Sequence, residues 1–363
     1  MPLEGKGFFI WKIPDCEHGD PQAIADLAVE AGLTHVLIKV ADTVNAYNIY
    51  DSIDRVPPVA RALQDKDIQV WGWQYVTGRD PLGEANKAIE RVVSLGLDGY
   101  VIDAEKEYKE PGKKLSARKF MDRLRDGLPD KPVALSSYRF PSYHPQIPWQ
   151  EFLEGCDYHM PQVYWVWADN AGDQLRRSVR ELQSLTPQRP VIPTGSAYKE
   201  HGWQPAPGEV VEFLQTAQSL NLSGVNFYSW DSSRRYLPDV WNAIRDYAWS
   251  PPAEDVPIRL IAALNTHDPE QVVALYAPAA VHITAARTVQ GQDALKAWYQ
   301  TMFAELLPEA RFALTGYTSE GNIRHMSWTA ASALGKVQNG SDTLGLSNGE
   351  IVFHYSFFSV TPS

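Results

Sequence analysis

The nine residues LDGYVIDAE, positions 97–105, read as a short apolar strand that ends in two carboxylates. Residues two apart in a strand point to the same side, so if Val101 faces inward, Asp103 and Glu105 do so too. Two carboxylates stacked at the end of a buried strand are costly for folding and useful for acid–base chemistry. Taken alone, the stretch fits a catalytic pair and a solvated strand end equally well, so its neighbours must decide.

Short apolar runs alternate with helical patterns on both sides of this strand. We predict strands at residues 7–13, 35–40, 69–76, 100–103, 132–137, 158–165, 190–194 and 224–230. We predict helices at residues 21–31, 58–65, 81–96, 116–126, 149–153, 173–184, 207–219 and 238–247. Eight strand–helix units in about 250 residues are typical of a (β/α)8 TIM barrel. An open doubly wound sheet fits less well, because no glycine-rich phosphate loop follows the first strand.

The carboxyl ends of the strands surround the active site in such a barrel. The side chains expected there are mostly aromatic or polar: Lys12, Lys39, Asp42, Gln74, Tyr75, Asp103, Glu105, Tyr138, Gln162, Tyr164, Tyr198, Tyr228, Trp230 and Asp231. Aromatic rings with polar tips suit sugar faces, whereas a phosphorylated metabolite would call for a glycine- and serine-rich anion nest. The rim therefore favours a sugar polymer as the substrate.

Composition excludes several function classes. A net charge of −11 over 363 residues argues against nucleic acid or an anionic membrane as the main partner. The N-terminus lacks the pattern of a signal peptide, and no segment approaches the ~18 apolar residues of a membrane span. We expect a cytoplasmic protein, or an extracellular one if a leader has been removed. The two cysteines, Cys16 and Cys156, fall on opposite faces of the predicted barrel, too far apart to form a disulfide.

Other kinds of site find weaker support. Asp15, Glu17 and His18 cluster in the first loop, where a solvated loop explains them better than a metal site does. We therefore predict no metal ion and no other cofactor. No nucleophile elbow indicates a serine triad. A Schiff base on Lys12 or Lys39 is a less simple role than pairing with a nearby aspartate.

A second domain follows a proline-rich acidic linker, SPPAEDVP, at residues 250–257. The barrel would then span residues 1–249 and the second domain residues 258–363. We predict helices at residues 258–265, 269–275 and 292–306, and strands at residues 281–285, 310–317, 322–334, 340–347 and 350–360. Helices followed by an antiparallel sheet indicate a smaller α+β domain.

Several short stretches of this segment carry a resemblance: LNTHDPE at 264–270, LYA at 275–277, VQG at 289–291, WTA at 328–330 and NGEIV at 348–352. The segment resembles the nuclear-transport-factor-2-like superfamily, whose α+β fold is cone-shaped. That family includes small-molecule enzymes, dimerisation modules and binding accessories. The resemblance implies a cone pocket lined by residues among His282, Trp298, Tyr299, His325 and Trp328, and it allows a homodimer through this domain.

The opening stretch resembles the strand-four signature of glycoside hydrolase family 18, Asp-Gly-x-Asp-x-Asp-x-Glu. Asp98, Gly99, Asp103 and Glu105 match it, and Val101 replaces the middle acid. The Asp-x-Glu ending and VLIKVAD at 36–42 also resemble family 25 lysozymes. MPQVY at 160–164 looks like the family 18 segment with a substrate-binding tyrosine, and GVNFYSWD at 224–231 looks like the aromatic floor of the sugar site.

These resemblances imply a glycosidase that cleaves an N-acetylhexosamine-containing glycan of the chitin or peptidoglycan type. Glu105 would be the general acid, and Asp103 would orient the substrate's N-acetyl group as it attacks the anomeric carbon, a substrate-assisted route. Adjacent carboxylates raise one another's pKa, and we expect this to keep Glu105 protonated near neutral pH. Tyr164 would hold the acetamide, and Tyr228 or Trp230 would stack on the sugar. The further substrate-binding candidates are Gln162, Asp231, Tyr138, Lys39 and Gln74.

Two departures from these families leave alternatives open. Val101 removes an acid of family 18, and IWK at 10–12 stands where family 25 places an aspartate. One alternative is a carbohydrate-binding or scaffold protein whose barrel has lost catalysis and whose C-terminal domain mediates pairing. Another is an unrelated barrel enzyme that uses the C-terminal pocket.

Overall fold

The computed structural model describes residues 3–250, 254–347 and 349–362. The chain divides into two compact units, one ending at residue 252 and the other beginning at residue 253. The middle of the predicted linker, residues 251–253, lies outside the described residues. Its last two positions belong instead to helix α10 (Val256–Leu264), because the Asp255 side chain caps that helix and accepts a hydrogen bond from the Val256 amide.

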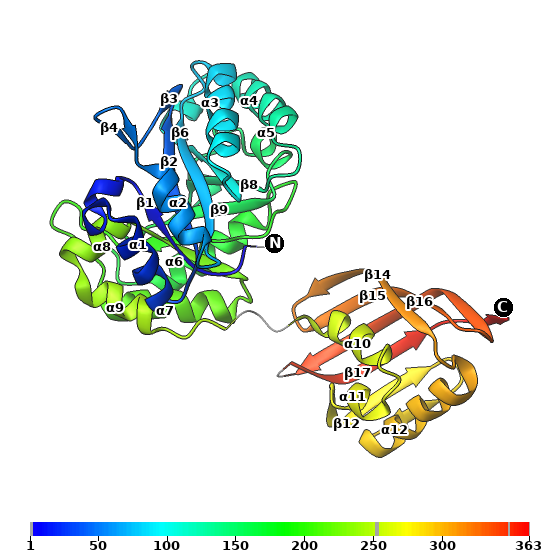
Figure 1. Cartoon of the computed structure of the whole chain (residues 1–363). Coiled ribbons are helices and arrows are strands. Elements are labelled where there is room, and N and C mark those ends of the chain that lie inside the picture. Colours follow the sequence, from blue (N-terminus) through cyan, green and yellow to red (C-terminus); the bar gives the residue numbers. More distant parts are fainter. Residues whose placement is uncertain (1–2, 251–253, 348, 363) are drawn as a thin grey trace. The chain divides into compact units, whose positions relative to one another are not determined.

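The first unit is a closed barrel of eight parallel strands (Figure 1). The strands are β1 Gly5–Ile10, β2 Leu33–Asp42, β6 Gln69–Val76, β7 Gly99–Ala104, β8 Val133–Tyr138, β9 Tyr158–Val163, β10 Thr194–Ser196 and β11 Gly224–Tyr228. Each pairs with the next in chain order, and β1 pairs with both β2 and β11. This topology confirms the predicted (β/α)8 barrel.

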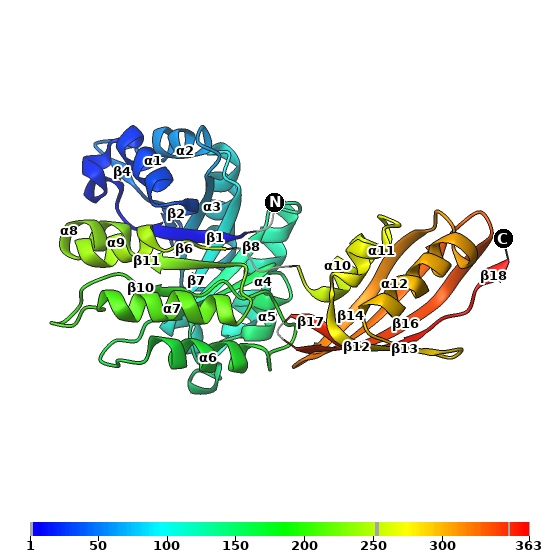
Figure 2. The same ribbon diagram turned by 90° about the horizontal axis from the view of Figure 1, so that it is seen from below.

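Helices surround the strands on the outside of the barrel (Figure 2). They are α1 Pro21–Glu30, α2 Val56–Gln64, α3 Pro81–Ser94, α4 Lys113–Gly127, α5 Trp149–Leu153, α6 Ala171–Leu182, α7 Pro207–Ser219, α8 Trp230–Tyr236 and α9 Pro238–Asp246. Aspartates cap the first turns of α1 and α3, and each of these two helices has a proline in its first turn, as the sequence indicates. No helix among the described residues is long and apolar enough to cross a bilayer. Both cysteines are buried and unpaired.

Three local features of the barrel differ from the prediction. The seventh strand begins at Thr194, four residues later than expected, since Pro190 and Pro193 have no N–H to donate to a ladder. The loop after β2 forms three short strands, β3 Asn45–Ala46, β4 Ile49–Tyr50 and β5 Ile53–Asp54. The extra helix α8 begins directly after β11. The last two features shape the site described below.

Two residues of the opening motif hold the strands together. The Oδ2 atom of Asp98 accepts hydrogen bonds from the Val70 amide at 2.8 Å and from Gln64 Nε2 at 3.1 Å. Gly99 lies under the indole of Trp71, where a Cβ atom would come within 2.4 Å of the ring. A side chain at position 99 would therefore push this strand away from its neighbour. Asp98 and Gly99 thus position the strand that carries the carboxylates.

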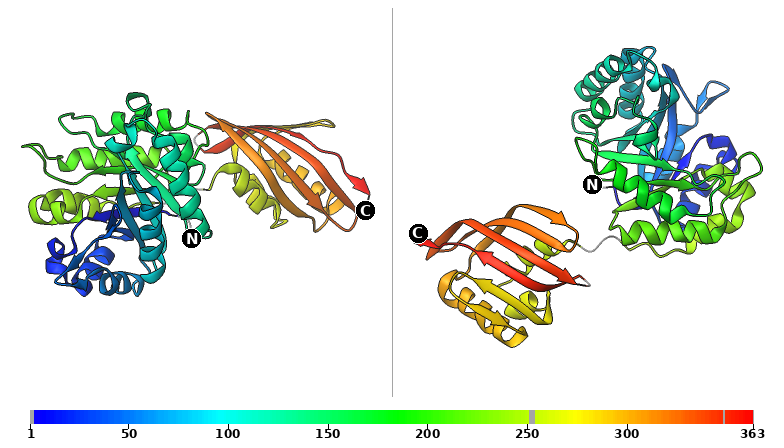
Figure 3. Two further views of the ribbon diagram at one scale, coloured as in Figure 1. Left: turned by 90° about the horizontal axis from the view of Figure 1, so that it is seen from above. Right: turned by 180° about the vertical axis from the view of Figure 1, so that it is seen from behind.

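The second unit is an α+β domain, as predicted. Its strands are β12 Tyr276–Thr284, β13 Thr288–Gln290, β14 Arg311–Glu320, β15 Ile323–Ala331, β16 Gly335–Ser347, β17 Glu350–Phe357 and β18 Thr361–Pro362. Helices α10, α11 (Pro269–Val273) and α12 (Gln292–Thr301) cover one face of this sheet (Figure 2). No helix of the described residues covers the other face (Figure 3). The core, which includes Trp298 and Trp328, lies between helices and sheet.

Candidate active site

The two carboxylates of the opening motif meet at one glutamine. Asp103 lies near the end of β7, and Glu105 follows that strand directly. Gln162 on β9 points its Nε2 atom at both, 3.0 Å from Asp103 Oδ1 and 3.0 Å from Glu105 Oε1. The Ser136 hydroxyl of β8 lies 3.4 Å from the same nitrogen. One side-chain amide therefore holds both carboxylates in place.

A pocket opens over this pair. It has a volume of about 150 Å³ and is lined by Phe9, Trp73, Asp103, Glu105, Ser136, Gln162, Tyr164 and Tyr228. Three predicted site residues, Gln162, Tyr164 and Tyr228, thus surround the two predicted catalytic residues. The floor is aromatic: the Trp73 ring lies 5.9 Å from Phe9 and 6.4 Å from Tyr228 between centroids. The pocket combines acidic groups with ring faces.

A wider cleft continues outward from this pocket. It has a volume of about 520 Å³ and shares Glu105, Gln162, Tyr164 and Tyr228 with the pocket. Its remaining lining residues are Trp11, Tyr198, Lys199, Glu200, Ser229, Asp231, Ser232 and Tyr236. The rings of Tyr164, Tyr198 and Tyr228 lie 5.3–6.1 Å apart between centroids, and those of Tyr164 and Tyr228 line both the pocket and the cleft. The predicted residue Asp231 therefore faces this cleft, and burial raises the pKa of its carboxyl.

The electrostatics of the pair favour a retained proton. Burial and, next, the neighbouring Glu105 charge raise the pKa of Asp103 well above its usual range, while Lys39 and Gln162 oppose the shift. Beneath Asp103, Val101 is fully buried in an apolar cluster with Phe9, Trp71, Trp73, Ala134 and Met160. The position where the family 18 signature has an acid is therefore part of the apolar barrel interior. The described residues hold no group of His, Cys, Asp and Glu that could ligate a metal ion.

Tyr138 occupies a neighbouring site outside the pocket. Its ring stacks on His144 at 3.7 Å between centroids, and the Lys109 ammonium lies 4.0 Å above the ring. Burial and the Glu105 charge raise the pKa of its phenol to about 12. Close by, the Tyr75 hydroxyl donates to Glu107 Oε2 at 2.5 Å. Glu107 is a third carboxylate, in the helical turn Lys106–Lys109 that follows β7, and it was not among the predicted site residues.

Three predicted substrate-binding residues are not free to bind substrate through the pocket. Trp230 is fully buried as the first residue of α8 and packs its ring 4.9 Å from that of Trp241. Gln74 is fully buried and bonds the Thr43 and Glu84 carbonyls and the Tyr100 hydroxyl. Neither residue lines the pocket, because both side chains point away from the barrel axis toward the surrounding helices. These two assignments were wrong.

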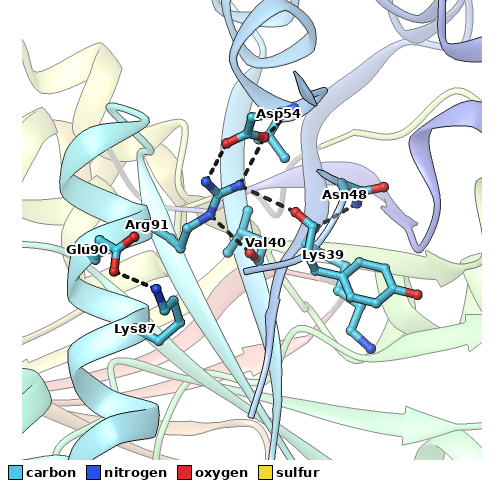
Figure 4. A network of polar contacts seen from close by, with 9 residues as sticks. Lys39, Val40, Asn48, Asp54, Lys87, Glu90 and Arg91 are labelled. Carbon is cyan, nitrogen blue, oxygen red and sulfur yellow. Dashed lines mark hydrogen bonds and ion pairs between the residues drawn. The ribbon is translucent and has the colours of Figure 1, made fainter. Parts of the chain in front are cut away.

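The third of these residues, Lys39 (Figure 4), does not line the pocket. Its ammonium is nearly buried and lies 2.7 Å from Asp42 Oδ2. It also lies 4.9 Å from the Trp73 ring centroid. Trp73 separates the cation from the pocket, so we assign Lys39 an electrostatic role: it opposes the raised pKa of Asp103.

The pocket and the wider cleft also contain residues that the sequence analysis did not select. Phe9, Trp73 and Ser136 line the pocket, and Trp11 and Tyr236 line the wider cleft. Ser136 could have been predicted from the pairing of neighbouring strands, because it lies opposite Asp103 in the register of β7 and β8. Phe9 and Trp73 looked like ordinary core residues, and only closure of the barrel brings them under the carboxylates.

The C-terminal unit has a separate, nearly filled cavity of about 10 Å³, lined among others by His282, Trp298, Tyr299 and Trp328. His325 is not among its lining residues. It is exposed, three positions before Trp328, and its Nδ1 lies 3.0 Å from Thr343 Oγ1 on the opposite face of the sheet. The alternation of strand β15 explains this difference, because Met326 and Trp328 take the inward positions.

A chain of polar groups lies beside this cavity. The Tyr276 hydroxyl lies 2.6 Å from both the Tyr299 hydroxyl and His354 Nδ1. The other ring nitrogen of His354 lies 3.0 Å from Asp342 Oδ2. His282 stacks on His354 at 4.2 Å between centroids, and neither of its ring nitrogens has a hydrogen-bond partner among the described residues. A cavity of this size can hold about one water molecule, with room to hydrogen-bond a ring nitrogen of His282.

This arrangement predicts acid sensitivity of the C-terminal unit. Burial and then His354 lower the pKa of His282 to about 2, whereas an unfolded histidine titrates near ~6.5. Below pH ~6.5 the unfolded chain binds a proton that the folded domain excludes, so the free energy of unfolding falls by about 1.4 kcal/mol for each pH unit of further acidification. The stabilisation is complete above this pH and is lost as pH falls. Between pH ~6.5 and ~4.5, the free energy of unfolding of a His282→Phe variant should fall by about 2 kcal/mol less than that of wild type.

Hydrogen exchange of the β12 and β17 amides, followed by mass spectrometry at the two pH values on the full chain, measures this difference. His325→Phe is the matched control, since His325 is exposed on the same sheet. Equal pH dependence in wild type and His282→Phe would contradict the prediction.

Comparison with known proteins identifies the C-terminal unit. Residues 258–354 match the family model described as a SnoaL-like domain. A nuclear-transport-factor-2-like protein of unknown function from Cytophaga hutchinsonii is 16% identical, with 28% of this chain and 86% of that chain covered and a TM-score of 0.25. A similar protein from Burkholderia xenovorans is 15% identical, with 30% and 82% covered and a TM-score of 0.26. The family-model match alone assigns a SnoaL-like domain to residues 258–354 of the second unit.

The barrel also has a solved neighbour. A chitinase from Chromobacterium violaceum is 12% identical, with 67% of this chain and 98% of that chain covered and a TM-score of 0.49. Among curated proteins, none matches the sequence of this chain.

Proposed function

We propose that the barrel is a glycoside hydrolase that cleaves an N-acetylhexosamine-containing glycan of the chitin or peptidoglycan type. The observation that carries this proposal is the Asp103–Glu105 pair, held by Gln162 beneath the aromatic wall of Tyr164 and Tyr228. Acids and ring faces in one pocket suit a sugar whose glycosidic bond must be protonated. The wider cleft leaves room for a substrate longer than one sugar.

The pair supplies one proton to the reaction. A second negative charge beside Glu105 is unfavourable for the half-buried Asp103, and desolvation together with this charge raises the pKa of Asp103 well above its usual range. When Glu105 holds that proton, it donates it to the glycosidic oxygen as the bond from that oxygen to the anomeric carbon breaks. Asp103 is then a carboxylate and accepts a hydrogen bond from the acetamide N–H.

The acetamide itself supplies the nucleophile in this proposal. Its carbonyl oxygen forms a bond to the anomeric carbon as the leaving sugar departs, and no second protein carboxylate attacks. Water then attacks the same carbon and releases the product, while Glu105 takes back a proton as general base. Tyr164 holds the acetamide and Tyr228 contacts the sugar ring, since both rings line the pocket over the acids.

A substrate panel tests this reaction. N-acetylglucosamine oligomers and peptidoglycan are incubated with the full chain, and released reducing ends are measured beside glucose oligomers of the same linkage. We expect cleavage of the N-acetylated substrates alone, because only they carry the internal nucleophile. Equal cleavage of both series would exclude the substrate-assisted route, and cleavage of neither would exclude hydrolysis.

A second candidate function is sugar binding without catalysis. The observation that favours it is Val101, which places an apolar side chain in a buried apolar cluster where the family 18 signature has an acid. Without that acid, Asp103 has no partner below it with which to exchange a proton. Oligomers that bind to wild type without being cleaved would support this candidate.

A further inference from the structure

A second cleft lies beside the candidate active site, at the carboxyl ends of β1 and β2. It has a volume of about 480 Å³ and is lined by Lys12, Pro14, Asp15, Ala46, Tyr47, Asn48, Ile49 and Tyr50. One wall is the loop after β1. The other is the excursion of residues 43–54, which contains the short strands β3, β4 and β5. None of these lining residues belongs to the pocket over Asp103 and Glu105.

Two buried side chains hold the wall of this cleft (Figure 4). The Arg91 guanidinium on α3 forms two hydrogen bonds to the Asp54 carboxylate, and its Nε donates to the Val40 carbonyl at 3.1 Å. Asn48 is 2% exposed, accepts from the Ile13 amide at 2.9 Å and donates to the Lys39 carbonyl at 2.8 Å. The middle of the excursion, at Asn48, and its carboxyl end, at Asp54, are therefore tied to the barrel, so the cleft is formed before any ligand arrives.

Aromatic side chains connect this cleft to the active site. The Lys39 ammonium lies 4.4 Å from the Tyr47 ring centroid on one side and 4.9 Å from the Trp73 ring centroid on the other. Trp11 lines the wider cleft, and Asn48, the residue after Tyr47, donates to the Trp11 carbonyl at 3.1 Å. Trp11 and Tyr47 thus form a ridge with one cleft on each side. Trp11 is 38% exposed, so a ligand crossing the ridge can contact its ring.

We propose that this cleft binds further sugar units of the same N-acetylated glycan, beyond those held over Asp103 and Glu105. This inference rests on the proposed function. Tyr50 and Tyr47 offer ring faces to the sugar, and Lys12 and Asp15 offer polar groups to its hydroxyl and acetamide substituents. A rigid site of this kind binds the glycan without reorganising the protein. We therefore expect the affinity for N-acetylated oligomers to increase with their length.

Binding to an inactive variant tests this proposal. In the Glu105→Gln background, N-acetylglucosamine oligomers of two to six units are titrated by calorimetry, with and without Tyr50→Ala. We expect Tyr50→Ala to weaken the longest oligomers about five- to tenfold, the effect of one aromatic contact, and to leave the shortest unchanged. Ile53→Ala is the matched control, since Ile53 pairs with Tyr50 in the same hairpin, is exposed and does not line the cleft.

The outcomes separate this inference from the proposed function. If Tyr50→Ala leaves the affinity for long oligomers unchanged, or weakens binding equally at every length, the proposal that the second cleft binds sugar is overturned. The proposed function of the active site is unaffected by either result. The same loss in Ile53→Ala would assign the effect to the hairpin and also overturn the proposal for the second cleft. If no oligomer of any length binds, both the inference and the proposed function fall.

Discussion

Replacing Glu105 with glutamine is expected to lower kcat on N-acetylglucosamine oligomers by about 10²- to 10⁴-fold, the usual contribution of a general acid. The amide cannot donate a proton to the glycosidic oxygen. It keeps nearly the same shape, and its oxygen can still accept the hydrogen bond from Gln162 Nε2. The pocket should therefore still bind substrate, so the loss should appear in kcat with KM little changed.

Steady-state kinetics of wild type and Glu105→Gln measure this effect. Glu110→Gln is the matched control, because Glu110 is an exposed carboxylate a few residues further along the same loop and lies 3.7 Å from Lys113. It should leave both constants unchanged. Identical rates in wild type and Glu105→Gln would contradict the assignment of the acid. If binding persisted in that case, the non-catalytic candidate would gain support.

Replacing Trp230 with alanine is expected to reduce the free energy of unfolding of the barrel by about 3–5 kcal/mol. The indole is fully buried, lies 6.0 Å from the Phe8 ring and 4.9 Å from the Trp241 ring, and donates to Glu17 at 3.3 Å. Its removal leaves a cavity that the strand and two helices cannot close. Total stabilities are usually ~5–15 kcal/mol, so this change alone could unfold much of the protein.

Urea unfolding followed by circular dichroism measures this loss. Trp167→Ala removes the same ring from a site that is 68% exposed, and it should change stability by no more than about 0.5 kcal/mol. The Trp230→Phe variant keeps an aromatic ring in the core, so this variant protein should bind the sugar oligomers with wild-type affinity. A Trp230→Ala protein as stable as wild type, but unable to bind oligomers, would restore Trp230 to the sugar site.

The sequence alone determined the barrel architecture and the choice of Asp103 and Glu105 as the candidate acids. Alternating apolar runs and helix signals predict a barrel because each strand must be buried on both faces while its helix covers it. The period of two along a strand places Asp103 and Glu105 on one side, wherever the strand lies. Gln162 and Tyr164 could be assigned to the same rim because the strands of a barrel all point the same way, although 57 residues separate Gln162 from Glu105.

The tertiary structure decided which rim side chains face inward. Tyr228 and Trp230 are two apart, and a continuing strand would have placed both over the acids. The strand instead ends at Tyr228, and α8 begins at Trp230 and turns the indole into the core. Gln74 was misplaced for a related reason, since its neighbour Trp73 takes the inward position and Gln74 faces the helices. Spacing fixes which residues share a side, but only packing against the rest of the chain decides which side faces the pocket.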